Sequence, residues 1–223
     1  MDRIEDQLLG TTQENLVKQH FGGLVSKEII CKDCPHYYER EEHFLALNLD
    51  VKNKRNILHG LESYIEGEIL DGDNAYYCAE CKTKVKAMMR TTVKKLPKYL
   101  ILVLKRFEFD FERGIKQKIN EYCEFPFELD MQPFTYDELH KNKKEKAQGL
   151  INETSQFSLR GVIIHSGFAD SGHYYSLIKD KKDGKSRWLE FNDQYVTNFD
   201  LTRLPYVAFG KKEAYLLSPF SYK

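Results

Sequence analysis

Apolar residues along the chain fall mostly in short runs or at every second position, two patterns typical of β-strands. The most apolar run, residues 99–106 with the sequence YLILVLKR, predicts a central strand, and Phe107, Phe109 and Phe111 alternate directly after it. Further strands or extended segments are predicted at residues 24–30, 43–51, 84–94, 119–127, 157–165 and 214–217. The pattern therefore predicts a fold dominated by β-sheet.

Helical spacing of apolar residues is confined to a few short segments. Residues 56–65 predict a helix, and residues 12–19 predict a short amphipathic helix that ends at Gly22 and Gly23. Residues 135–140 predict one or two further helical turns. Short helices among many strands indicate the α+β class, with a mostly antiparallel sheet.

Residues 141–156 are polar and rich in lysine, and they show no apolar period. We interpret them as an exposed loop. A binding patch for nucleic acid is the weaker interpretation, because no aromatic residues are interleaved with the lysines.

The segment from residue 161 to residue 193 organises the rest of the chain. Three apolar runs, at residues 162–164, 174–178 and 188–191, predict three adjacent strands. His173 directly follows a glycine before the second strand, and Asn192 and Asp193 follow the third strand. The three strands would thus place an imidazole beside an amide or a carboxylate.

Such a pair has a chemical use. A thiol or hydroxyl nucleophile needs a base within hydrogen-bond reach, and the base needs a third group that orients it. Imidazole suits the base, because its ordinary pKa is about 6.5. The alternative is that His173 is only a polar residue that meets water at the end of a strand.

Composition and charge exclude several classes of function. The chain has 223 residues, enough for one large domain or two small ones, and 34 basic side chains balance 34 acidic ones. This balance argues against a nucleic-acid partner that binds by counterion release. The sequence contains no run of 18 apolar residues, and its first residues lack the pattern of a signal peptide. We therefore expect no membrane partner and a cytoplasmic or nuclear location.

Four of the five cysteines form two C-x-x-C pairs, Cys31 with Cys34 and Cys78 with Cys81. Two such pairs can present four thiolates to one tetrahedral zinc ion, and they fit a reducing compartment. Four free cysteines are the alternative. The fifth, Cys123, lies in a predicted extended segment and is interpreted as a small apolar residue of the core.

The sequence around His173 resembles the histidine box of the ubiquitin-specific proteases, the papain-like cysteine deubiquitinases. The matching segments are HSGFADSGHYYS at residues 165–176, WLEFND at 188–193, LKRF at 104–107 and KINEYCEFP at 118–126. The resemblance implies that His173 is the general base, that Asn192 orients it and that Asp193 assists. It covers nearly the whole chain.

The resemblance also implies an architecture. Residues 1–223 would be part of a catalytic domain, with fingers at residues 24–95 and a palm at residues 96–223 that carries the polar loop 141–156. The zinc held by Cys31, Cys34, Cys78 and Cys81 would be structural and would lie at the tip of the fingers.

The resemblance further implies a channel for the extended tail of ubiquitin. Phe107, Phe109, His165 and Tyr174 would flank the tail, and the loops at residues 110–117 and 166–172 would cover it. A narrow aromatic channel admits only the slim Gly-Gly end of ubiquitin. Plain core packing of one strand face is the alternative for the three alternating phenylalanines.

One departure from the family is clear. The family's cysteine box, G-x-x-N-x-G-N-T-C-Y, does not occur in this sequence. We therefore expect a fragment of a thiol-dependent deubiquitinase that lacks the thumb and the nucleophile and is inactive alone. The parent enzyme would hydrolyse the isopeptide or peptide bond after the C-terminal glycine of ubiquitin, with ubiquitin and ubiquitinated proteins as partners. The alternatives are a ubiquitin-binding pseudoenzyme and a zinc-dependent interaction module.

Overall fold

The computed structural model describes residues 2–141, 155–210 and 216–221, and the chain divides into two compact units. The first unit comprises residues 1–45, 61–97 and 130–155, and the second comprises residues 46–60, 98–129 and 156–223. The two units are interleaved in sequence, whereas the expected fingers and palm meet at a single boundary between residues 95 and 96. Residues 46–60 belong to the second unit because strand β3 (Leu47–Asp50) pairs there with β8 (Tyr99–Lys105).

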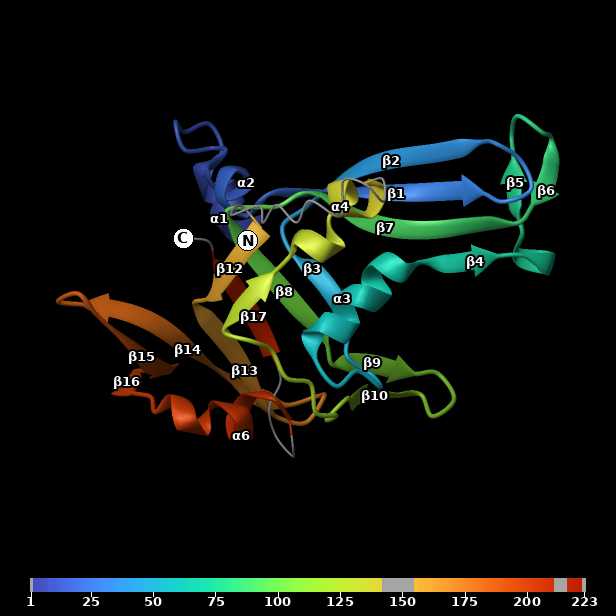
Figure 1. Cartoon of the computed structure of the whole chain (residues 1–223). Helices are drawn as coiled ribbons and strands as arrows, with labels where there is room; N and C mark the ends of the chain where they lie inside the picture. The colour runs from blue at the N-terminus through green and yellow to red at the C-terminus, as the bar shows by residue number, and fades with distance from the viewer. Residues whose placement is uncertain (1, 142–154, 211–215, 222–223) are drawn as a thin grey trace. The chain divides into compact units, whose positions relative to one another are not determined.

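The first unit is built on a four-stranded antiparallel sheet with the order β2-β1-β7-β4 (Figure 1). A separate two-stranded hairpin, β5 with β6, belongs to the same unit. The bounds of these strands are β1 Gly23–Cys31, β2 Tyr37–Phe44, β4 Glu68–Leu70, β5 Tyr76–Cys78, β6 Thr83–Val85 and β7 Ala87–Lys95.

A buried carboxylate organises the middle of this sheet. Glu28 on β1 is fully buried, and its oxygens accept hydrogen bonds from the Tyr37 hydroxyl at 2.6 Å and from Arg90 Nε at 2.8 Å. His140 Nε2 lies 2.9 Å from the same carboxylate. Burial and the hydrogen bond to Glu28 raise the pKa of Tyr37. Because an unpaired buried charge would be costly, these partners fix β1, β2, β7 and the helix that carries His140 together.

The helices are short. Their bounds are α1 Asp2–Leu8, α2 Leu16–Phe21, α3 Ile57–Glu66, α4 Tyr136–His140 and α6 Leu204–Ala208, with 3₁₀ turns η1 Gly72–Asn74, η2 Gln132–Phe134 and η4 Leu201–Arg203. The helices predicted at residues 56–65 and 135–140 are confirmed; Thr135 caps α4 by accepting a hydrogen bond from the amide of Glu138. The helix predicted at residues 12–19 begins only at Leu16, and α1 was not predicted. Within the described ranges no helix has the length and apolar character needed to cross a membrane.

The second unit contains a sheet of nine strands within the described residues, with the order β11-β12-β17-β13-β14-β15-β16 and with β8 and β3 continuing from β17. The pairs that link β12, β17, β13, β14, β15 and β16, and the pair of β17 with β8, are antiparallel, whereas β3 and β8 pair in parallel. A two-stranded hairpin, β9 with β10, lies in the same unit. The remaining bounds are β9 Phe107–Asp110, β10 Ile115–Lys118, β11 Glu128–Asp130, β12 Gln156–Leu159, β13 Gly161–Gly167, β14 Gly172–Lys182, β15 Lys185–Asn192, β16 Tyr195–Asn198 and β17 Leu216–Ser221.

The predicted central strand is confirmed as β8, which lies between β17 and β3 and buries Leu100, Leu102 and Leu104. Residues 119–127 do not form a strand. This segment is held by single hydrogen bonds, such as that from the amide of Cys123 to the carbonyl of Phe209 at 2.7 Å. Nearly all of the loop predicted at residues 141–156 lies outside the described residues.

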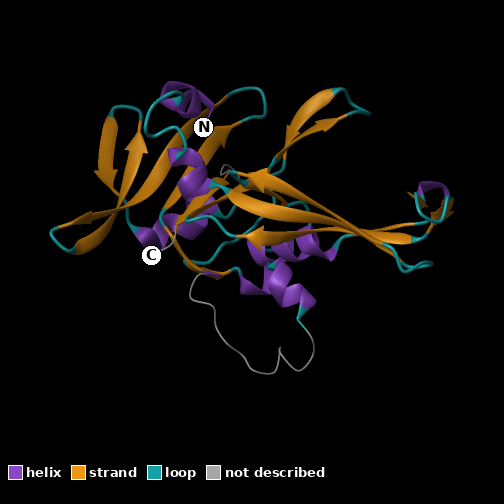
Figure 2. Cartoon of the chain, turned by 90° about the horizontal axis from the view of Figure 1, so that it is seen from above, coloured by secondary structure: helices purple, strands orange, loops and turns teal. Residues whose placement is uncertain are grey.

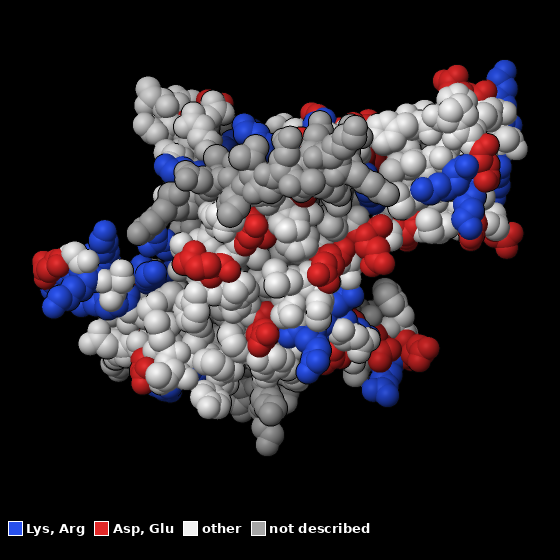
Figure 3. All heavy atoms as spheres, viewed as in Figure 1, with Lys and Arg blue, Asp and Glu red and all other residues white. Residues whose placement is uncertain are grey.

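Each unit contains more strand than helix among its described residues, which confirms the sheet-dominated α+β class (Figure 2). On the face shown in Figure 3, Lys and Arg side chains are interspersed with Asp and Glu, in keeping with the formal net charge of zero.

The central strand generates a stability prediction. Leu102 is completely buried, so Leu102→Ala should lower the free energy of unfolding by about 2–5 kcal/mol through lost burial and an unfilled cavity. Val196→Ala on the exposed strand β16 is the control and should change it by less than about 0.5 kcal/mol. Urea unfolding followed by circular dichroism measures both values. Equal effects of the two substitutions would contradict the central position of β8.

Candidate functional site

Three paired strands position the histidine and its neighbour. On β13 and β14, Ser166 lies opposite His173, and on β15 and β16, Asn192 lies opposite Tyr195. Because β14 and β15 are antiparallel, the start of β14 and the end of β15 meet at one end of the ladder. His173 and Asn192 therefore approach each other although 19 residues separate them.

His173 Nε2 lies 2.7 Å from Asn192 Oδ1. An amide oxygen can only accept a hydrogen bond, so Nε2 carries the hydrogen and Nδ1 of the neutral ring keeps a lone pair. Among the described residues, none forms a hydrogen bond with Nδ1. The arrangement thus presents a proton acceptor of fixed orientation, in a side chain that is about half exposed.

Asp193 is a secondary neighbour of this ring. Its Oδ2 lies 3.8 Å from His173 Nε2, and its side chain is 74% exposed. Its backbone is in the left-handed region with φ of 52°, which Asp tolerates better than most residues, and it begins the turn between β15 and β16. Asn192 is therefore the hydrogen-bond partner, whereas Asp193 contributes a charge that solvent screens.

A cavity of about 380 Å³ in the second unit brings together the four residues expected to flank a peptide tail. The ring of His165 lies 5.3 Å from that of Phe107 and 4.5 Å from that of Tyr174, measured between centroids. Phe107, Phe109 and Phe111 are 43%, 47% and 89% exposed, which excludes plain core packing for this strand face. The cavity is lined by Phe107, Glu108, Phe109, Lys116, His165, Ala169 and Tyr174.

His165 connects the cavity to His173. Its side chain is buried, and burial, followed by the positive charge of Lys118, lowers the pKa of His165. A Cβ atom on Gly172 would overlap the imidazole of His165. Only glycine therefore fits at the position immediately before His173, and the His165 ring packs against the backbone there.

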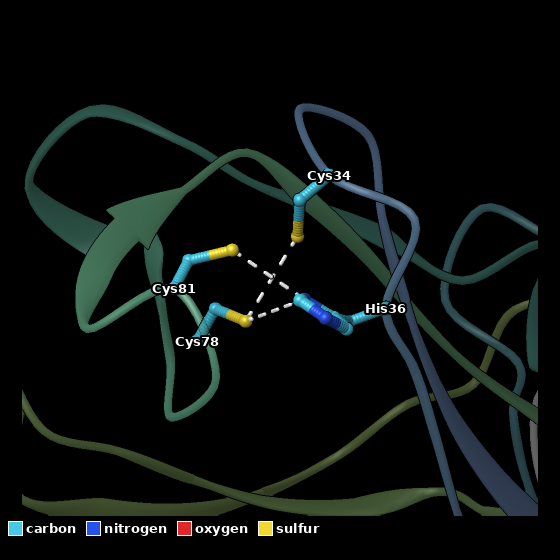
Figure 4. A group of neighbouring side chains, drawn as sticks. All are labelled: Cys34, His36, Cys78 and Cys81. Carbon is cyan, nitrogen blue, oxygen red and sulfur yellow. Dashed lines mark hydrogen bonds between the residues drawn. The ribbon is translucent and has the colours of Figure 1, made fainter.

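The tip of the first unit carries a cluster of metal-ligand type (Figure 4). The ligand atoms of Cys34, His36, Cys78 and Cys81 all lie within 4.8 Å of one another. His36 Nδ1 is 3.3 Å from Cys78 Sγ and 3.4 Å from Cys81 Sγ. A hydrogen bond from the Tyr38 hydroxyl is the largest of several effects that lower the pKa of Cys78 to about 6. Three thiols and one imidazole form a donor set that can hold a metal ion.

The cluster shares Cys34, Cys78 and Cys81 with the predicted ligand set and adds His36, whereas Cys31 lies beside it. Cys31 ends β1 opposite Ala87, and its side chain is buried in a small apolar cluster with Cys78 and Val85. Burial is the largest cause that raises the pKa of Cys31 to about 11. The C-x-H spacing of Cys34 and His36 was the signal for His36 in the sequence, since zinc sites combine imidazole with thiolate ligands.

The remaining cysteine is unsuited to nucleophilic chemistry. Cys123 is buried in the second unit, and burial raises its pKa to about 11. A nucleophilic cysteine needs a lowered pKa and access to substrate. The structure agrees with the prediction that Cys123 fills the core.

Comparison with known proteins gives the family. The family model described as ubiquitin carboxyl-terminal hydrolase matches residues 1–218. Ubiquitin carboxyl-terminal hydrolase 24 of Mus musculus is 41% identical over 229 aligned residues, which cover 94% of this chain and 9% of that protein. Probable ubiquitin carboxyl-terminal hydrolase FAF of Drosophila melanogaster is 40% identical over 204 residues, which cover 88% of this chain and 7% of that protein.

Solved structures are similar as well. The Ubp8/Sgf11/Sus1/Sgf73 module of SAGA bound to ubiquitin aldehyde contains a chain that matches with a TM-score of 0.77 and 26% identity, over 100% of this chain and 48% of that one. The module bound to monoubiquitin matches with a TM-score of 0.75 and 28% identity, over 96% of this chain and 44% of that one.

The chain spans less than a tenth of the length of the curated relatives named here. The match of the family model and the relatives near 40% identity nevertheless extend over most of the 223 residues, and they show that the chain belongs to the ubiquitin carboxyl-terminal hydrolase family.

Proposed function

We propose that this chain is the palm and fingers of a thiol-dependent deubiquitinase, with His173 as general base and Asn192 as the residue that orients it. The observation that carries the proposal is the 2.7 Å contact between His173 Nε2 and Asn192 Oδ1, because it leaves Nδ1 available to take a proton. The adjoining aromatic cavity supplies a place for an extended peptide tail.

The proposed reaction proceeds in two steps. Nδ1 of His173 takes the proton of a cysteine thiol, the thiolate attacks the carbonyl carbon of the C-terminal glycine of ubiquitin, and the imidazolium returns the proton to the leaving amine. Water, deprotonated by the same imidazole, then hydrolyses the acyl-enzyme. Asn192 holds the ring in place without supplying a charge, and the carboxylate of Asp193, 3.8 Å from His173 Nε2, supplies a negative charge nearby.

The nucleophile in this proposal comes from outside residues 1–223. Cys34, Cys78 and Cys81 belong to the metal-ligand cluster, Cys31 is buried beside it, and Cys123 is buried with a raised pKa. The chain by itself should therefore bind ubiquitin and not cleave its conjugates.

The proposed substrates are ubiquitin and ubiquitinated proteins. The similar SAGA modules are described as bound to monoubiquitin and to ubiquitin aldehyde, which supports a ubiquitin partner here. A formal net charge of zero supports a protein partner over a nucleic acid. Cysteines that form no disulfide support a reducing compartment, the cytoplasm or the nucleus.

Ubiquitin binding tests the proposal. The chain should bind ubiquitin, and removal of ubiquitin's two C-terminal glycines should weaken binding by about tenfold or more, because the tail would no longer fill the cavity. Phe109→Ala should weaken binding by about tenfold, the loss of one aromatic contact. Isothermal titration calorimetry measures each dissociation constant.

The control for this experiment is Tyr206→Ala, which removes an aromatic side chain that is 83% exposed and lies outside the cavity. Its affinity for ubiquitin should match that of the unmodified chain. Equal affinity for intact and shortened ubiquitin would refute the tail-binding role of the cavity.

We also propose that the cluster of Cys34, His36, Cys78 and Cys81 holds one structural zinc ion. Four protein ligands close a tetrahedral shell, so no coordination position is left for water or substrate. The role of the ion is then to stabilise the two turns that supply the ligands.

A matched pair of variants tests the ligand set. His36→Ala should reduce the bound zinc well below one ion per chain and lower the melting temperature by several degrees, because binding energy at such a site is folding energy. Cys31→Ser should keep one zinc per chain. Elemental analysis and thermal unfolding measure the two effects. Zinc lost in Cys31→Ser but kept in His36→Ala would restore the four-cysteine site.

A further inference from the structure

Two segments of the second unit border the aromatic cavity. One is the hairpin of β9 and β10, which contributes Phe107, Phe109 and Lys116, and the other is the turn between β13 and β14, which contributes Ala169. The ammonium group of Lys118 donates a hydrogen bond to the carbonyl oxygen of Gly167 and so joins the two segments. This contact is separate from the backbone pairing of strands, since β10 pairs with β9 alone among the strands of the described residues.

The β10 end of this contact is fixed at the base of the hairpin. Lys118 is the last residue of β10 and lies opposite Phe107. The next amide, that of Ile119, donates to the carbonyl of Arg106 at 2.7 Å. On the neighbouring position of β9, Glu108 forms an ion pair with Lys52 at 3.0 Å. The backbone of Lys118 is therefore fixed by strand pairing, and its side chain extends from the hairpin to the carbonyl of Gly167.

The Gly167 end is equally constrained. Gly167 has a φ of 117°, and a Cβ there would lie 2.7 Å from both Gly172 Cα and Ser171 O. The turn is closed by a hydrogen bond from the amide of Phe168 to the carbonyl of Ser171 at 2.7 Å. Gly167 pairs with Gly172, the residue before His173, so the position of this carbonyl is coupled to that of the histidine.

Lys118 also acts on His165 through its charge. His165 is buried between Phe107 and Tyr174, and its ring fills the space beside Gly172. The positive charge of Lys118 adds to burial in lowering the pKa of His165. One lysine thus restrains the turn and disfavours a second positive charge beneath it.

We propose that Lys118 is a positioning residue that ties the β9–β10 hairpin to the β13–β14 turn and thereby holds the cavity and the backbone of His173 in the geometry that receives the ubiquitin tail. The proposal rests on the proposed function for the identity of the ligand, whereas the tie itself belongs to the unliganded chain. In this proposal Lys118 acts through the segments that it joins and not on the reacting atoms.

Hydrogen exchange of the unliganded chain tests the tie. Lys118→Met keeps most of the aliphatic stem and removes the donor. Loss of one charge-assisted hydrogen bond should raise the exchange rates of amides in residues 166–173 by roughly tenfold. Amides of β8 should be unchanged. Lys118→Arg restores a cationic donor and should return most of the protection.

The matched control is Lys105→Met, which removes a surface ion pair with Asp50 in the same unit and leaves Lys118 in place. It should leave exchange at residues 166–173 unchanged. If Lys118→Met raises exchange no more than Lys105→Met does, the tie is refuted.

A measurement on the unmodified chain covers the case in which Lys118→Met does not fold. In a nitrogen-15 spectrum, the ammonium protons of Lys118 should exchange with water more slowly than those of Lys105, because the ion pair of Lys105 with Asp50 is exposed to solvent, whereas the side chain of Lys118 is fixed between two segments. Equal exchange of the two ammonium groups would also refute the tie.

Two further readouts separate a positioning role from simple stability and from the proposed function. The titration midpoint of His165 should move upward in Lys118→Met and return in Lys118→Arg, an electrostatic effect that general destabilisation would not reproduce. Affinity for ubiquitin should fall in Lys118→Met and not in Lys105→Met. Absence of ubiquitin binding by the unmodified chain would count against the proposed function alone, since exchange and titration need no ubiquitin.

Discussion

The register of the β13–β14–β15 ladder is the constraint on which the candidate site depends. His173 and Asn192 meet because Ser166 lies opposite His173 and because β15 ends beside the start of β14. A slip of one residue would turn the imidazole to the other face of the sheet. Gly167 and Gly172 fix this register at the turn, since neither position has room for a Cβ. The strand register thus determines that the side chains at positions 173 and 192 lie within hydrogen-bond distance.

The first unit is organised around polar side chains. Its sheet buries a carboxylate, Glu28, and surrounds it with Arg90, Tyr37 and His140, while its far hairpin gathers ligands of metal-binding type. Polar groups of fixed geometry, in addition to apolar packing, define this unit. Such groups determine which residues meet, and a metal ion bound by this cluster would stabilise the turns that supply its ligands.

The sequence predicted most of what depends on local pattern. It placed the central strand, the helix at residues 56–65 and the three strands around His173, and its resemblance to the ubiquitin-specific proteases pointed to the residues that line the aromatic cavity. Long-range pairing was not predictable from local pattern. The parallel pair β3–β8 moves residues 46–60 into the second unit, and single backbone hydrogen bonds hold residues 119–127 without a strand.

Local pattern is also insufficient at the metal-ligand cluster. The regular C-x-x-C spacing suggested Cys31, which ends strand β1 and packs with Cys78 and Val85. The structure adds His36, whose ligand atom lies within 4.8 Å of those of Cys34, Cys78 and Cys81. Spacing alone does not reveal where a strand ends or which further side chain reaches the cluster. The tie from Lys118 to Gly167 joins segments 49 residues apart and had no sequence signal.

The pairing of His173 with Asn192 is the central claim, and kinetics test it most directly. In a polypeptide that joins these residues to the cysteine-bearing part of the family's catalytic domain, Asn192→Ala should lower kcat for a ubiquitin conjugate at least about tenfold and change KM by less than about twofold, because orientation of the base acts mainly in the transition state. Asp193→Ala should have a smaller effect. An unchanged kcat in both variants would contradict the account.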